Sequence, residues 1–109
     1  MKGTHLGELE ELVLLIVASL HGQAYGVAVQ DEIVQKCNRS IGIGTVHNVL
    51  QRLLEKGFLE SHYGGTTKER GGRRKHLFMV TKTGMEAIAY VRTQRESLWK
   101  TIPKIAFNH

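Results

Sequence analysis

A row of hydrogen-bonding side chains falls on one side of residues 43–56. Apolar residues recur there at intervals of three and four, at Val46, Val49, Leu50, Leu53 and Leu54, which is the spacing of an amphipathic helix. The polar positions between them carry donors and acceptors but no carboxylate in the first three turns: Thr45, His47, Asn48, Gln51 and Arg52. Side chains of these types can hydrogen-bond to the edges of DNA bases. We therefore predict a helix whose exposed face reads a DNA groove. For His47, plain solvation is the alternative.

The second chemical feature is a cluster of positive charge just after that helix. The chain has a net charge of +5, and residues 68–82 alone contain six basic residues against one acidic residue, Glu69. A solvated surface usually mixes charges of both signs, so this concentration indicates a polyanionic partner. An anionic membrane is the weaker option, because no apolar face accompanies the charges. The residues expected to contact phosphate are Lys68, Arg70, Arg73, Arg74 and Lys75.

Other chemistry finds little support in the residue pattern. The six histidines never fall two to five residues apart, so no metal site is expected. Gly42-Ile43-Gly44 begins a dinucleotide-like pattern, but His47 stands where the third glycine belongs. The single cysteine, Cys37, is interpreted as a small buried apolar residue, with a redox-sensitive thiol as the alternative. We expect no enzymatic activity and no cofactor.

The elements that must position these side chains can be predicted from periodicity. Helices are expected over 6–20, 25–37, 43–56 and 83–102, with strands over 58–63 and 76–81 joined by the glycine-rich basic segment. Thr4 is the expected N-cap of the first helix and Gly57 the stop of the third. The predicted fold is mainly α with a small β-hairpin. Residues 1–82 form a winged helix-turn-helix DNA-binding domain, and residues 83–109 form a C-terminal dimerisation helix in the same compact unit.

More apolar surface is present than one domain of 109 residues can cover. Leu12 to Ala18 is apolar on every side, and a late stripe follows in the last helix. We predict a homodimer on a pseudo-palindromic DNA site, with the two reading helices about 34 Å apart. The expected interface residues are Leu9, Leu12, Ile16, Ile88, Leu98, Trp99 and Ile102. Trp99 is interpreted as interface packing. Alternatively, it stacks on a planar, small aromatic effector in a cavity between two copies.

The apolar run is too short for a membrane span. It covers seven residues, Leu12 to Ala18, whereas a span needs about 20. Three glutamates precede it, where a secretion signal would carry positive charge: Glu8, Glu10 and Glu11. A cytoplasmic protein without a membrane partner is therefore expected.

Several short stretches together resemble the PadR family of regulators in its short form. They are residues 9–20, Ala24-Tyr25-Gly26, 43–46, 50–59 and 71–75, followed by Phe78, Thr81 and Gly84. The chain departs from the family pattern at His47-Asn48, where Tyr-Pro is frequent, and at Leu77, where Tyr is common. The resemblance implies a homodimer held by the first and last helices, and a repressor relieved by a small-molecule effector.

Two other readings of the fold remain at this point. A winged helix can serve as a protein-interaction module, but that role predicts an acidic or apolar third-helix face and no basic wing. RNA binding predicts aromatic stacking residues for single-stranded bases, which the sequence does not display.

Overall fold

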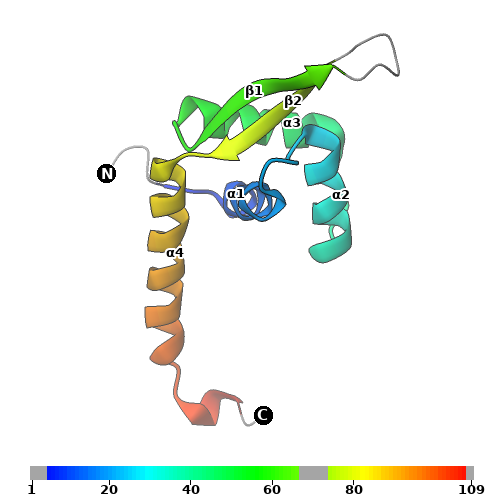
Figure 1. Cartoon of the computed structure of the whole chain (residues 1–109). Coiled ribbons are helices and arrows are strands. Elements are labelled where there is room, and N and C mark those ends of the chain that lie inside the picture. The colour runs from blue at the N-terminus through cyan, green and yellow to red at the C-terminus, as the bar shows by residue number, and fades with distance from the viewer. Residues whose placement is uncertain (1–4, 67–73, 108–109) are drawn as a thin grey trace.

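The computed structural model describes residues 5–66 and 74–107 of the chain. Three helices pack beneath a two-stranded hairpin, and a fourth helix projects away from them (Figure 1). This arrangement confirms the prediction of a mainly α protein with a small β-hairpin. The elements are α1 (Glu8–Leu20), α2 (Gly26–Lys36), α3 (Ile43–Glu55), β1 (Leu59–Thr66), β2 (Arg74–Val80), α4 (Lys82–Lys100) and the short 3-10 helix η1 (Lys104–Phe107).

Helix α1 begins two residues later than its apolar periodicity predicts. Its N-cap is Gly7, whose backbone N–H donates to the Glu10 carboxylate at 2.7 Å. Thr4, the expected N-cap, lies outside the described residues. The helix ends at Leu20 because His21 and Gly22 both adopt positive φ, at 28° and 89°. The Glu10 carboxylate of the first turn therefore fixes the N-cap residue through its backbone N–H.

Helix α3 ends where the sequence predicts. Gly57 has a φ of 79°, which a residue without a Cβ adopts at little cost. The N–H groups of Gly57 and Phe58 donate to the carbonyls of Leu54 and Leu53, both at 3.0 Å. This pair of bonds is a Schellman motif, and it satisfies carbonyls that the helix end would otherwise leave unpaired.

The start of helix α4 is hydrogen-bonded directly to Gly57 and Phe58, the turn that ends α3. Thr81 is its N-cap, and the Thr81 hydroxyl accepts from the Gly84 N–H at 3.0 Å. The hydroxyl also donates to the Gly57 carbonyl at 2.7 Å, while the Thr81 N–H donates to the Phe58 carbonyl at 3.0 Å. The first turn of α4 is thus anchored to the end of α3.

One apolar core joins the three N-terminal helices to the base of the hairpin. Val13, Leu14, Ile33, Leu53 and Phe58 are among its fully buried side chains. In the hairpin, Leu59 pairs with Val80 and Tyr63 with His76, and the register shifts beyond Tyr63. Strand β2 is also bonded to the segment between α1 and α2, since the Phe78 N–H donates to the Ala24 carbonyl at 2.8 Å. The hairpin therefore has a fixed position on the helices.

Beyond its first turns, α4 leaves this core and extends as an arm (Figure 1). The molecule measures 60 × 32 × 21 Å, and its radius of gyration is 16.5 Å, against about 13 Å for a compact domain of this length. The arm is held to the body by Arg95, whose guanidinium donates to the Glu11 carboxylate at 2.9 Å. The radius of gyration exceeds that of a compact domain because α4 is surrounded by solvent on most sides.

Candidate nucleic-acid interface

The polar face of α3 is fully presented to solvent. All five residues predicted to read DNA are exposed, whereas Val46, Val49, Leu50 and Leu53 of the same helix are buried. Between residues that the structure describes, this set makes one side-chain hydrogen bond, a long contact of 3.4 Å from the Gln51 amide to the Glu55 carboxylate. Thr45 lies in the first turn of the helix and Asn48 in the second, so both are near its N-terminal end, whereas Arg52 lies in the last turn.

His47 has a packing role that its sequence position did not reveal. A Cβ added to Gly26 would lie 2.7 Å from Cε1 and 3.2 Å from Nε2 of the imidazole. The ring therefore lies directly against the first residue of α2, in a space that exists only because Gly26 has no side chain. The contact sets how closely the first turn of α2 approaches α3, and it leaves part of His47 exposed on the reading face.

The tip of the basic hairpin falls largely outside the described residues. Lys68, Arg70 and Arg73 are in that range, and Arg74 is the first residue of β2. Lys75 is described and exposed, and its ammonium lies 4.6 Å from the centre of the Tyr25 ring. The structure therefore brings one predicted wing residue to the N-terminal end of α2. Tyr25 was not among the predicted site residues.

Below the tip, aromatic side chains stack along one face of the hairpin. Tyr63 and His76 are a cross-strand pair with ring centres 4.7 Å apart, and His76 lies 4.6 Å from Phe78. Phe78 is buried in the core, whereas Tyr63 is exposed. The stack therefore runs from the core toward the wing and stiffens the strands that carry its charge.

The predicted dimer residues divide into two groups. Ile16 and Ile88 are each only 7% exposed and pack in the core of their own chain, so they offer little surface to a second copy. Leu9 and Leu12 are half-buried. Leu98 and Trp99 are 68% and 64% exposed, and Ile102 is 38% exposed. Of the predicted interface residues, Leu98, Trp99 and Ile102 are thus the ones that expose a large apolar surface in the single chain.

Further exposed apolar residues extend that face beyond the predicted set. Tyr90 lies on the same helix, while Ile105 and Phe107 lie on η1. The Trp99 and Phe107 rings meet with centres 5.6 Å apart, because the chain turns after Lys100. Apolar spacing predicts a helix as far as Ile102, but α4 ends at Lys100, and Pro103, which cannot continue a helix, is the sequence signal for the turn.

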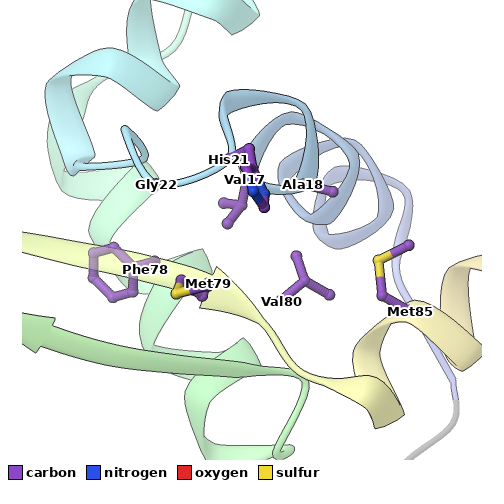
Figure 2. A pocket seen from close by; sticks show the side chains of 8 residues that line it. All are labelled: Val17, Ala18, His21, Gly22, Phe78, Met79, Val80 and Met85. Carbon is purple, nitrogen blue, oxygen red and sulfur yellow. The ribbon is translucent and has the colours of Figure 1, made fainter.

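Two hollows lie on the described surface beside α4. The first, of about 290 Å³, has Val17, Ala18 and His21 of α1 and the following turn on one side (Figure 2). Phe78, Met79 and Val80 of β2 face them, with Met85 of α4 at the edge. The second, of about 450 Å³, lies between His5 and Leu6 and the α4 residues Tyr90, Val91, Gln94, Arg95 and Leu98. Trp99 lines neither hollow.

A half-buried ion pair joins the end of the reading helix, α3, to α1. The Lys56 ammonium, at the end of α3, donates to the Glu10 carboxylate at 2.8 Å and to the His5 carbonyl at 3.0 Å. Burial raises the pKa of Glu10, but the hydrogen bonds from Lys56 and from the Gly7 N–H outweigh it and hold the pKa below its ordinary value. The carboxylate is therefore charged at neutral pH and ties α1 to α3.

No family model matches the chain. An uncharacterised protein from Lysinibacillus sphaericus is 32% identical over 80 residues, which are 72% of this chain and 69% of that protein. A PadR-like transcription factor from Bacteroides fragilis has a similar structure, with a TM-score of 0.71 and 17% identity over 85% of this chain and 84% of the other. A Streptococcus mutans protein gives a TM-score of 0.64 at 29% identity, covering 84% of this chain and 78% of its own.

A further similar structure is that of Bacillus subtilis PadR in complex with operator DNA. Its TM-score is 0.63 at 13% identity, and the match covers 88% of this chain and 48% of that one. The fold is therefore a PadR-like winged helix, as the sequence resemblance predicts. The chain belongs to the same family as the Lysinibacillus sphaericus protein. Among the residues that the structure describes, no helix has both the length and the apolar character to cross a bilayer.

Proposed function

We propose that this chain is a transcriptional regulator that binds duplex DNA in a sequence-specific way. The observation that carries the proposal is the exposed, carboxylate-free start of α3, followed by a segment, residues 68–82, whose charge of +5 equals the net charge of the whole chain. A helix of this kind enters the major groove with its N-terminal residues against base edges. The basic wing then contacts phosphates, which adds affinity without reading sequence.

In the proposed assembly, two copies bind one pseudo-palindromic operator. The arm of α4 and η1 exposes Leu98, Trp99 and Phe107, and a second copy is the simplest cover for such a face, because two-fold symmetry makes it self-complementary. We further propose that the protein represses transcription and that a small, flat aromatic effector relieves the repression. Trp99 is the residue proposed to stack on that effector.

The test is a pair of measurements on DNA fragments retained by the purified protein from its own genome. Affinity should fall steeply with salt, with a log–log slope of about −0.9 for each phosphate contact. Replacing Arg73 and Arg74 with Ala should weaken binding to all sequences about equally and flatten that slope. Asn48→Ala and Gln51→Ala should each cost about 1–3 kcal/mol of discrimination at one operator position, with non-specific affinity nearly unchanged.

A matched control is available on α2. Gln35 is an exposed glutamine of that helix, so Gln35→Ala removes the same amide without touching the reading face. It should leave both sequence preference and salt slope intact. Salt-independent binding, or full preference retained in Asn48→Ala and Gln51→Ala, would contradict the proposal. In that case the winged-helix protein-interaction module becomes the better assignment.

A further inference from the structure

The tripeptide Ala24-Tyr25-Gly26 touches both of the surfaces proposed to meet DNA. The Ala24 carbonyl accepts the Phe78 N–H of β2 at 2.8 Å. The Tyr25 ring lies beneath the Lys75 ammonium at 4.6 Å, and Gly26 lies against the His47 imidazole. Three consecutive residues, which end the connection from α1 and begin α2, therefore contact the base of the wing on one side and the reading helix on the other.

We propose that Tyr25 is a positioning residue for DNA binding: its ring holds the Lys75 ammonium where a backbone phosphate passes between the wing and the start of α2. The proposal rests on the proposed DNA-binding function and adds a specific phosphate contact to it. Tyr25 acts through Lys75, whose charge meets the phosphate. Gly26 and Ala24 fix the ring in place, because one is buried against His47 and the other is bonded to β2.

The choice of an aromatic partner has a physical consequence for Lys75. Lys36, Arg39 and Lys56 are each paired with a carboxylate, at 2.7–2.9 Å, which offsets their charge. A ring face attracts an ammonium through its quadrupole at distances up to about 6 Å, yet it carries no net charge. Lys75 is thus held in one region while its full positive charge stays available to an anion.

Holding the side chain also reduces the cost of binding. A free lysine loses much of its rotamer freedom when it is fixed on a phosphate, and a side chain already fixed on a ring loses less. The contact between Tyr25 and Lys75 also connects β2 to the N-cap residue of α2. The described part of the wing is therefore preorganised on the helices before DNA arrives.

Four variants test the role of the ring. Tyr25→Phe keeps the ring face and loses the hydroxyl, whereas Tyr25→Leu keeps an apolar side chain and loses the ring. Lys75→Met removes the charge, and Tyr25→Leu/Lys75→Met combines the two changes. Lys36→Met is the matched charge control, because Lys36 lies at the opposite end of α2. Binding is measured by fluorescence anisotropy on a short labelled duplex of random sequence over a range of salt concentrations.

The expected result is specific to a positioning role. Lys75→Met and Tyr25→Leu should each weaken binding roughly three- to tenfold and flatten the salt slope by about one phosphate contact. The double variant should bind no more weakly than Lys75→Met, and Tyr25→Phe should bind like the parent protein. Lys36→Met should change the slope less than Lys75→Met does. In the free protein, NMR should show the Lys75 ε-methylene protons shifted upfield by the ring, and Tyr25→Leu should abolish that shift.

Each contrary outcome has a separate meaning. If the parent protein binds with a steep salt slope but Tyr25→Leu keeps that slope, the positioning role is wrong and DNA binding stands. Loss of binding in Tyr25→Phe would show that the hydroxyl is the contact, which also overturns the proposal. No upfield shift in the free protein would remove the contact itself. A parent protein that binds no duplex would overturn the proposed function and this inference together.

Discussion

At the scale of single residues, Glu10 joins the N-terminal segment and the start of α1 to the end of α3. Its carboxylate accepts from the Lys56 ammonium at 2.8 Å and from the Gly7 N–H at 2.7 Å, and Lys56 reaches on to the His5 carbonyl. The side chain of Glu10 is only 9% exposed. A charge buried to this extent stabilises the fold while its partners are present and destabilises it when they are lost.

The lowered pKa of Glu10 predicts acid sensitivity of a defined sign. Because the folded-state pKa lies below the ordinary value of 4.5, the stabilisation is fully present above pH 4.5 and is lost as the pH falls through the folded-state pKa. Glu10→Gln should lower the free energy of unfolding by on the order of 1–3 kcal/mol at neutral pH and flatten its acid dependence. Urea unfolding followed by circular dichroism across this range measures both. Glu60→Gln, at an exposed position of β1, is the control, and equal acid profiles for Glu10→Gln and the parent would contradict the assignment.

The contact between Gly26 and His47 predicts that Gly26→Ala lowers the stability of the fold and that a second substitution at His47 restores it in part. Gly26→Ala places a methyl group 2.7 Å from the imidazole, so α2 or the ring must move, at a cost of about 1–3 kcal/mol of stability. Gly26→Ala/His47→Ala should recover much of that loss, since the second change removes the obstacle. Gly44→Ala is the control, because a Cβ there meets nothing within 4 Å. The measurement is thermal unfolding of the parent protein and the three variants. A double variant no more stable than Gly26→Ala would disprove the contact.

At the scale of elements, the first turn of α4 depends on one glycine. A Cβ at Gly84 would overlap the Phe58 carbonyl oxygen and come within 2.8 Å of Cγ1 of Val80. Backbone cannot give way as a flexible side chain can, so Gly84→Ala should cost about 1–3 kcal/mol or more and detach the start of α4 from the body. Hydrogen exchange should then speed up at the first amides of α4 but remain slow in α3. Unchanged protection in α4 would show that the helix is held elsewhere, through Arg95 and Glu11.

At the scale of the whole molecule, the arm formed by α4 and η1 presents exposed apolar side chains. Leu98 is 68% exposed and Trp99 64%, and Trp99 contacts Phe107 without being covered by it. A helix that buries so little of its apolar surface in one chain gains stability only when a second surface removes it from water. The chain is therefore expected to be a dimer with its two-fold axis near α1 and α4.

Leu98→Glu tests that expectation directly. A carboxylate in the proposed interface should produce monomers, lower the stability and weaken DNA binding together, because a single half-site gives too few contacts. Thr93→Glu is the matched control, since it adds the same charge to the other side of α4 and should leave the dimer intact. Light scattering and operator binding are measured on the same samples. A parent protein that is monomeric at micromolar concentration and still binds its operator tightly would falsify the scheme.

Local periodicity was enough to predict the elements themselves. The apolar spacing of α3, its end at Gly57 and the hairpin that follows depend on neighbours a few residues apart, so they can be read from the sequence. The exposed polar face of α3 follows from the same spacing. The positive cluster of residues 68–82 needs no structure at all, since charge is a property of composition.

Only the tertiary structure decided which apolar faces are used up inside one chain. Ile16 and Leu98 look alike in sequence, yet Ile16 is 7% exposed on α1, which packs against α2 and α3, whereas Leu98 on α4 is 68% exposed. The pairs Tyr25–Lys75 and Gly26–His47 join residues far apart in the chain. Their proximity depends on the angles at which elements cross. Those angles are set by the packing of the whole core, and no local pattern encodes them.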